Sequence, residues 1–215
     1  MKIIEQQISF GNEELLLTNQ RAIFWQQQKT LILSDLHLGK AAHFRKHGIA
    51  LPSQVSVHDL QRLQQLLLHF KAEQVIIVGD LLHAGANKEV NLLKDFIATF
   101  PYIHFTLVKG NHDKFPDYVL QDMGIHTICS HLNIGAIHFS HQHTNQNTFS
   151  ITGHIHPGVS LQFPDKKRLR LPCYVVAPQQ IILPAFSLFT GLDTRAVQSN
   201  VICYAFYEEG IFKIS

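Results

Sequence analysis

The chain has 215 residues, of which 46% are hydrophobic and 16% are charged. This composition predicts a single globular domain over residues 1–215 with a sizeable core, and it excludes a disordered chain. The net charge of +2, counted with neutral histidines, permits a phosphate-bearing substrate without requiring one.

The N-terminal segment and the cysteines indicate the compartment. No window holds about 18 consecutive apolar residues, so no membrane span is expected. Residues 1–14 lack the apolar core of a signal peptide. Cys129, Cys173 and Cys203 are widely spaced and form no CxxC pair, which favours reduced, mostly buried thiols. These features predict a cytoplasmic protein.

Short apolar runs recur through the first half of the chain. Strands are expected at residues 3–10, 15–18, 22–25, 30–34, 75–78 and 104–108. The first three would form an antiparallel opening segment. The last three are continuous apolar runs, which predicts strands buried on both faces.

Two helices are expected between these buried strands. Residues 53–70 carry apolar side chains at helical spacing, and Ser56 with Asp59 resembles a capping box at the N-terminus. Residues 88–100 repeat the helical spacing, and Pro101 marks the end of that helix. Strands that alternate with helices predict βαβ units and a parallel sheet.

The second half is mostly strands. They are expected at residues 134–140, 148–152, 169–176, 180–183, 201–207 and 211–214. The sequence EEG at 208–210 is typical of a hairpin turn between the last two. The basic run KKRLR at 166–170 is interpreted as a solvated hairpin in preference to a nucleic-acid contact. The chain is therefore expected to be α/β first and mainly antiparallel β afterwards.

Ionisable and amide side chains follow five of the predicted strands. They are Asp35, His37, Asp80, Asn111, His112, His141, His154 and His156. In open α/β sheets, ligands bind beyond the carboxyl ends of the strands. Carboxylate and amide oxygens with imidazole nitrogens suit Mn²⁺, Fe²⁺ or Zn²⁺, and the lack of cysteine argues against a thiolate zinc site. So many ligands predict two ions that share a carboxylate.

These residues lie in motifs that resemble the calcineurin-like metallophosphoesterase superfamily. The motifs are SDLHLG at 34–39, GD at 79–80, GNHD at 110–113 and GHIH at 153–156. Further stretches are similar to the bacterial branch called ligase-associated DNA damage response endonuclease, PdeM. They are RAIFW at 21–25, RLPCY at 170–174, LPAF at 183–186 and FTG at 189–191. The resemblance implies an α/β fold with an α+β-like second half, built as a four-layer αββα sandwich of two mixed β-sheets.

The resemblance also implies a role for each ligand. Asp35, His37 and His156 would bind the first metal, and Asn111, His141 and His154 the second. Asp80 would bridge the two. The implied cofactors are two divalent metal ions, with Mn²⁺ favoured and Fe²⁺, Zn²⁺ or Mg²⁺ as alternatives. His112 matches the histidine that lies near the leaving group.

The fourth motif of the superfamily is little more than one histidine at a strand end. His131, His138 and His143 compete with His141 for this role. His138 lies inside the predicted strand and His131 precedes it. His143 lies in a loop rich in Thr, Asn and Gln. His141 is the prediction, and His143 is the principal alternative.

The remaining candidates surround the ligands. Asp113 either orients His112 or caps the segment that follows. His83 either supports a ligand by hydrogen bond or has a substrate role. Lys40, Arg45 and Arg170 are candidates for gripping phosphates, with Lys40 the strongest because it follows the first metal motif.

The predicted function is hydrolysis of phosphate esters by in-line attack of a metal-bridging hydroxide. The resemblance implies a phosphodiesterase or nuclease linked to DNA repair, with DNA as substrate and repair ligases or helicases as partners. Two alternatives stay open. One is a phosphomonoesterase or cyclic-nucleotide hydrolase with the same site. The other is a weakly catalytic, metal-bearing component of a repair complex.

Overall fold

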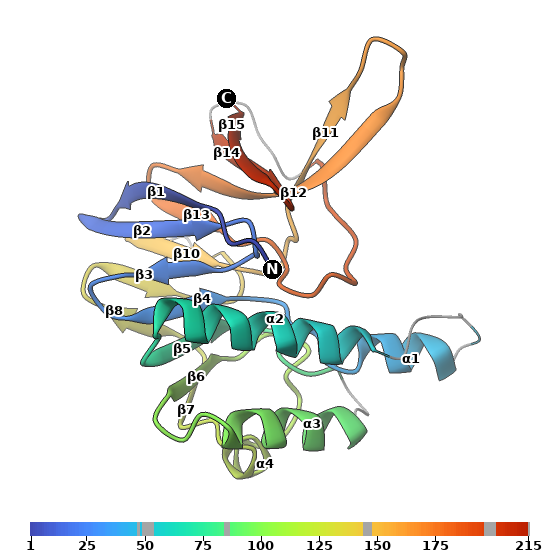
Figure 1. The fold of residues 1–215 in the computed structure, drawn as a ribbon. Helices are drawn as coiled ribbons and strands as arrows, with labels where there is room; N and C mark the ends of the chain where they lie inside the picture. Colours follow the sequence, from blue (N-terminus) through green and yellow to red (C-terminus); the bar gives the residue numbers. More distant parts are fainter. Residues whose placement is uncertain (47, 49–53, 84–86, 144–147, 196–200, 215) are drawn as a thin grey trace.

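The computed structural model describes residues 1–46, 48, 54–83, 87–143, 148–195 and 201–214 (Figure 1). Two mixed β-sheets pack face to face. The first has the order β1 (Glu5–Phe10), β2 (Glu13–Thr18), β3 (Ile23–Trp25), β4 (Thr30–Leu33), β5 (Gln74–Val78), β6 (His104–Val108) and β7 (Thr127–Cys129). As predicted, β1 to β3 are antiparallel neighbours and β4 to β6 run parallel, while β4 also pairs antiparallel with β3 and the unpredicted β7 adds a further parallel strand.

The second sheet contains the strands of the second half. Its order is β15 (Gly210–Ile214), β14 (Ile202–Tyr207), β12 (Arg168–Ala177), β13 (Gln180–Ile182), β10 (Phe149–Thr152), β9 (Ile137–Phe139) and β8 (Leu132–Ile134), and β11 (Gly158–Gln162) pairs with β12. The predicted EEG turn connects β14 to β15, where Tyr207 pairs with Gly210. The strand expected at 134–140 is instead an antiparallel pair, β8 and β9, and β11 was not predicted.

Helices cover the outer face of the first sheet (Figure 1). They are α1 (Lys40–Lys46), α2 (Val55–Phe70), α3 (Asn87–Ala98) and α4 (Asp117–Asp122). The predicted helices at 53–70 and 88–100 correspond to α2 and α3. The short helices α1 and α4 were not predicted. None of the helices in the described ranges is long and apolar enough to cross a membrane.

The central strands β4, β5 and β6 are buried on both faces because the two core layers lie on opposite sides of the sheet. In β5, Val75 and Ile77 face the helices, whereas Ile76 and Val78 face the second sheet. Side chains alternate along a strand, so one apolar run supplies both layers. This confirms the interpretation of the continuous apolar runs.

The predicted capping box of α2 is wrong. Gln54 occupies the N-cap without a side-chain hydrogen bond. Asp59 is buried and pairs with Arg62, one turn further along the helix, at 3.1 Å. Asp59 also accepts a hydrogen bond from the Leu188 amide. A buried carboxylate is costly without such partners, so pairing Asp59 with Arg62 stabilises the fold more than a side-chain cap on the first turn of the helix would.

The α/β fold with two mixed sheets is confirmed. The outer face of the second sheet carries a smaller apolar cluster around Cys173, Val175 and Cys203, and no residue of a described helix belongs to it. One reason is the connection from β10 to its parallel neighbour β13, which is the β11–β12 hairpin and not a helix. All three cysteines are free, and Cys173 and Cys203 are buried, as predicted.

Candidate metal centre

The candidate ligands lie at the carboxyl ends of strands from both sheets. Asp35 and His37 follow β4, and Asp80 follows β5. His141 follows β9, and the GHIH motif that holds His154 and His156 follows β10. The structure therefore brings residues that are more than 100 positions apart to one shared edge of the two sheets.

Five of these ligands have a left-handed backbone, which is unusual for residues other than glycine. Their φ angles are 54° at Asp35, 48° at His37, 52° at Asp80, 73° at His154 and 54° at His156. This conformation costs free energy for side chains with a Cβ, and strain of this kind collects at functional sites. The loops after the strands are therefore shaped to aim these side chains inward.

Two glycines let the backbone approach the ligands closely. A Cβ on Gly79, in the GD motif, would overlap the ring of His141. A Cβ on Gly110, which opens GNHD, would overlap the carboxylate of Asp80. Both glycines belong to the motifs GD and GNHD, but no role was predicted for either of them. Their position next to ligand residues in the sequence could have predicted this role, because a glycine lets the backbone approach a neighbouring side chain closely.

Asp35, His37 and His156 form one cluster of potential ligand atoms. Oδ1 of Asp35 lies 3.1 Å from Nε2 of His156 and 3.8 Å from Nε2 of His37. The two Nε2 atoms are 3.3 Å apart. The other carboxylate oxygen of Asp35 accepts a hydrogen bond from the backbone amide of His154 at 3.0 Å.

Asp80, His141 and His154 form a second cluster. Oδ2 of Asp80 lies 3.4 Å from Nε2 of His141, and this nitrogen lies 3.3 Å from Nδ1 of His154. The other ring nitrogen of His141 lies 3.0 Å from the carbonyl oxygen of Val78, to which it can donate. If Nδ1 donates this bond, the ring proton is on Nδ1 and the lone pair of Nε2 is available to bind a cation.

Asp80 faces both clusters. Its Oδ2 atom also lies 4.0 Å from Nε2 of His37 in the first cluster. Its Oδ1 atom accepts a hydrogen bond from the backbone amide of His112 at 2.9 Å, which fixes the carboxylate plane. A single oxygen between two sets of imidazole nitrogens has the position that a bridging ligand requires.

The donor set fits divalent cations. Oδ1 of Asp35 is buried and makes no hydrogen bond among the described residues, although Nε2 of His156 lies 3.1 Å away and Nε2 of His37 lies 3.8 Å away. A buried carboxylate oxygen without a partner is costly unless a cation satisfies it. Each cluster joins carboxylate oxygen to imidazole nitrogen, the combination that suits Mn²⁺, Fe²⁺ and Zn²⁺.

The pKa values of His37 and Asp80 keep both side chains in the form that binds a metal at pH 7, whereas the pKa of His141 favours its protonated form. Burial, reinforced by the charge of Lys40, lowers the pKa of His37 to about 3, so its imidazole is neutral at pH 7. Burial opposes ionisation of Asp80, but the hydrogen bond and charge of His141 outweigh it and lower the pKa of Asp80 to about 2. Burial also opposes the charged form of His141, yet Asp80 and Asp35 raise its pKa to about 9.

The alternatives for the fourth motif lie elsewhere. His138 is buried within β9, where its Nδ1 atom contacts Asn133 at 2.7 Å and its ring stacks on His131. His143 is described and exposed, and it belongs to neither cluster. Of the four candidates, His141 is the one that contacts Asp80 and His154. This geometry supports His141 as the candidate ligand.

The residues of GNHD take different positions. Asn111 is exposed at the end of β6. The ring of His112 lies 5.8 Å from that of His37 and stacks on His83 at 5.4 Å. Asp113 is buried and accepts hydrogen bonds from three backbone amides, those of Leu81, Leu82 and Gly110. Both of its oxygens hold backbone that precedes Asp113 in the chain, so this carboxylate ties the loop after β5 to the GNHD loop.

The predicted phosphate-gripping residues are spread over separate elements. Lys40 begins α1, and its charge acts on Asp35, Asp80 and His37. Arg45 lies near the end of the same helix. Arg170 lies on β12, in the part that pairs with β11, and is exposed. Thus Lys40 lies beside the ligands, while Arg170 belongs to the hairpin that follows His156.

Comparison with known proteins defines the class. Residues 28–174 match the family described as calcineurin-like phosphoesterase. This match covers more than half of the chain, so the protein belongs to that family, as its motifs predicted. It is therefore a hydrolase that acts on phosphoric ester bonds, and its family uses divalent metals.

Three solved structures resemble the chain. The nuclease MPE of Pseudomonas putida is 28% identical, with a TM-score of 0.81 over 94% of this chain and 96% of that one. The protein AQ665 of Aquifex aeolicus, of unknown function, is 18% identical, with a TM-score of 0.42 over 59% and 78%. The phosphoesterase Yfce of E. coli is 14% identical, with a TM-score of 0.43 over 86% and 97%. No curated protein matches the chain in sequence.

Proposed function

We propose that this protein is a dinuclear metal-dependent phosphodiesterase that acts as a nuclease in DNA repair. The observation that carries the proposal is Asp80, whose Oδ2 atom faces Nε2 of His141 at 3.4 Å and Nε2 of His37 at 4.0 Å, one from each cluster. The likeness to the nuclease of Pseudomonas putida supports the choice of substrate. The repair role and repair ligases or helicases as partners rest on the sequence motifs.

The proposed ligand sets follow the clusters. Asp35, His37 and His156 hold the first cation, His141 and His154 hold the second together with Asn111, and Asp80 serves both. Two divalent cations, when bound, neutralise the phosphoryl oxygens and lower the pKa of a water molecule that attacks phosphorus in line. Mn²⁺ is the proposed metal because carboxylate, amide and imidazole ligands suit it.

His112 is the proposed general acid. Its backbone amide holds Asp80, and its ring lies beside the rings of His37 and His83 at the half-buried end of β6. A protonated imidazole at this position can transfer its ring proton to the leaving oxygen as the ester bond breaks. His83 would support the His112 ring by stacking on it. The proposed role of Asp113 is to position the two loops.

Lys40 is proposed to hold a non-reacting phosphate oxygen. Burial lowers the pKa of its ammonium group, while the negative charges of Asp35 and Asp80 oppose that change. These interactions place a cation beside the ligands, where a phosphate would lie when both metals are present. Arg45 and Arg170 would contact phosphates further along the substrate.

A substrate panel with Mn²⁺ tests the proposal. It contains an aryl phosphomonoester, an aryl phosphodiester, cyclic nucleotides, and single- and double-stranded DNA. We expect hydrolysis of the aryl phosphodiester and of DNA, both abolished by EDTA. Turnover confined to the monoester or to cyclic nucleotides would overturn the nuclease proposal. No turnover of any substrate by the Mn²⁺-loaded protein would favour a metal-bearing component of a repair complex.

A further inference from the structure

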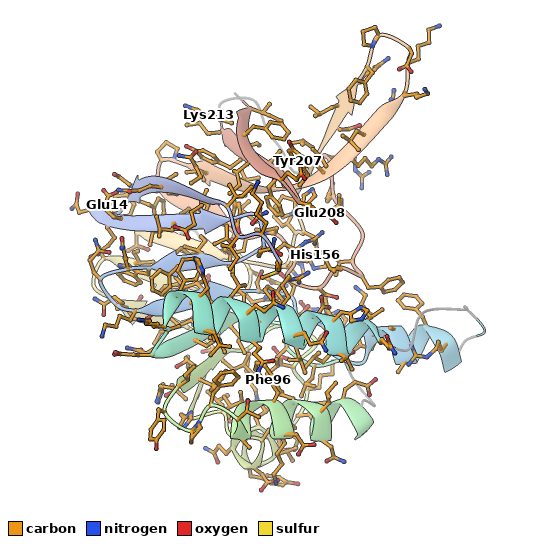
Figure 2. The ribbon with its side chains drawn as sticks, viewed as in Figure 1. Glu14, Phe96, His156, Tyr207, Glu208 and Lys213 are labelled. Carbon is orange, nitrogen blue, oxygen red and sulfur yellow. The ribbon has the colours of Figure 1, made fainter. Side chains whose placement is uncertain are left out.

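The hairpin of β11 and β12 leaves the body of the protein directly beside the candidate metal centre. Residues 173–177 of β12 pair with β13 and β14, but residues 168–172 pair with β11. Figure 1 shows this distal part extending away from both sheets. The hairpin begins at Gly158, two residues after His156, which lies between the hairpin and the helices in the view of Figure 2. A strand bound along it would therefore lead to the site.

The two faces of the hairpin differ. Arg170 pairs with Ser160 and Arg168 pairs with Gln162, so these polar side chains share one face. The intervening pair, Leu161 and Leu169, lies on the other face. Neither arginine forms an ion pair or hydrogen bond with another described residue. Two guanidinium groups thus stand on one face without an internal partner.

The hairpin concentrates positive charge. Residues 158–172 contain Lys166, Lys167, Arg168 and Arg170 against Asp165 alone, a net charge of +3. The whole chain has a net charge of +2, so all other residues together have −1. Within the described part of the chain, Lys167 is the one cation of this set that is paired, with Asp165 at 2.9 Å on the exposed turn. The excess positive charge of the protein therefore lies on this hairpin.

The distal part of this hairpin contributes little to the stability of the fold. Its distal part is held by its own ladder, and an isolated two-stranded hairpin is marginally stable in water. It also exposes apolar surface, since Phe163 is 48% exposed and Leu169 is 42% exposed. An arm with unpaired arginines and an exposed aromatic ring at its tip combines the two features that hold nucleic-acid strands, namely phosphate contacts and base stacking.

We propose that the β11–β12 hairpin is a nucleic-acid-binding arm whose Arg168 and Arg170 contact the phosphate backbone of the strand that is cleaved at the metal centre. This inference rests on the proposed nuclease function and replaces the interpretation of KKRLR as a solvated hairpin. Arg170 pairs with Ser160, four residues after His156, and Arg168 pairs with Gln162, six residues after it. At about 3.3 Å per residue, the two contacts lie about 13 Å and about 20 Å along the strand from His156.

The test is a charge-removal variant, Arg168→Gln with Arg170→Gln. Its matched control is Lys71→Gln with Lys94→Gln, which removes two exposed cations from the helical side of the first sheet. Binding of a labelled single-stranded 12-nucleotide DNA is measured by fluorescence anisotropy in EDTA, and kcat/KM is measured with Mn²⁺ for this DNA and for an aryl phosphodiester.

We expect the arm variant to lose at least about tenfold in affinity for DNA and in kcat/KM on it, and to lose less in kcat/KM on the aryl phosphodiester, which carries a single phosphate. The slope of log affinity against log salt should shrink by about 1.4, or 0.7 for each lost phosphate contact on a single strand. The control pair should bind and cleave as the wild type does. Arg168→Lys with Arg170→Lys should restore most of the binding, which excludes misfolding as the cause.

The outcomes separate this inference from the proposed function. If the arm variant binds and cleaves DNA as the wild type does, the arm has no such role while the nuclease function stands. If the wild type cleaves no DNA but binds it through the arginines, the nuclease function fails while the arm stands. If the arm variant and the control lose equal affinity, general charge is responsible and the inference is overturned. A wild type that neither binds nor cleaves DNA overturns both.

Discussion

Asp80 and His141 come from different sheets, yet Oδ2 of Asp80 lies 3.4 Å from Nε2 of His141. The same relationship holds in the other cluster, where Asp35 of the first sheet meets His156 of the second at 3.1 Å. Each cluster thus joins the carboxyl ends of strands from both sheets. Any cation held there also ties the two sheets together, so metal binding and fold stability are coupled.

Gly110→Ala should damage the centre without changing a ligand. The added Cβ would overlap the carboxylate of Asp80 and displace it from both clusters. We expect weaker Mn²⁺ binding in calorimetry and at least about a 100-fold loss of phosphodiesterase activity, the scale of changes that misplace a ligand. Gly191→Ala is the matched control, because its Cβ would meet open space. Equal effects at the two glycines would contradict the proposed close approach.

Asp80→Asn should abolish hydrolysis and weaken both metal sites. The amide can still accept the hydrogen bond from the His112 backbone through Oδ1, so the loop should be preserved. Its NH₂ group, however, would face the histidine nitrogens of both clusters in place of a charged oxygen. We expect a shallower rise of the melting temperature with Mn²⁺ and at least about a 100-fold loss of turnover. Asp122→Asn, on an exposed carboxylate paired with Lys94, should leave both unchanged.

His112→Asn should separate metal binding from turnover. The bond to Asp80 comes from the backbone amide of residue 112 and survives the change of side chain. We therefore expect Mn²⁺ affinity near that of the wild type and a fall in kcat of about 10²- to 10⁴-fold, the usual contribution of an acid or base. An aryl phosphodiester with a good leaving group should be less affected than DNA. Normal turnover of both substrates would remove His112 from the mechanism.

The metal-free protein should lose stability as pH rises from 6.5 to 9. Burial opposes the charged imidazolium of His141, but Asp80 and Asp35 outweigh it and raise its pKa to about 9. Since the folded state binds this proton more tightly, its contribution is fully present below pH 6.5 and is lost as pH approaches 9. The expected slope is up to about 1.4 kcal/mol per pH unit.

Urea unfolding in EDTA measures this effect, with His141→Asn as reference. The difference in unfolding free energy between wild type and variant should shrink across this pH window. With Mn²⁺ present the trend should reverse, because a metal ligand must be neutral and binding displaces the proton. The lowered pKa of His37, near 3, affects stability only below pH 6.5 and leaves this window clear. A pH-independent difference would contradict the assigned state of His141.

Asp113→Asn should lower stability more than it lowers chemistry. The carboxylate of this residue accepts hydrogen bonds from the backbone amides of Leu81, Leu82 and Gly110. An Asn side chain would turn an NH₂ group toward at least one of these donors. We expect a loss of about 1–3 kcal/mol in unfolding free energy, the cost of an unsatisfied buried group. The kcat of the folded, Mn²⁺-saturated variant should stay near that of the wild type. A large loss of kcat with unchanged stability would assign Asp113 to catalysis.

Local patterns predicted the elements well where a single rule applied. The continuous apolar run at 75–78 and the EEG turn at 208–210 both correspond to observed structure. They were less reliable where tertiary partners compete with local rules. Asp59 looked like a capping residue, but burial paired it with Arg62. The strand β11 and the short helices α1 and α4 were not predicted from local patterns, and β11 forms by pairing with the neighbouring strand β12.

The sequence by itself determined which side chains stand at the ends of strands, because apolar runs and the polar residues after them are local features. Local patterns did not determine which of these side chains share a cluster, and the grouping that was predicted came from the resemblance of the motifs to the family. Only the packing of two sheets decided that His156 joins Asp35, that His141 and not His143 meets Asp80, and that Gly79 and Gly110 lie against ligands. These contacts join residues distant in the chain, and their geometry depends on how the sheets pack, which no local pattern records.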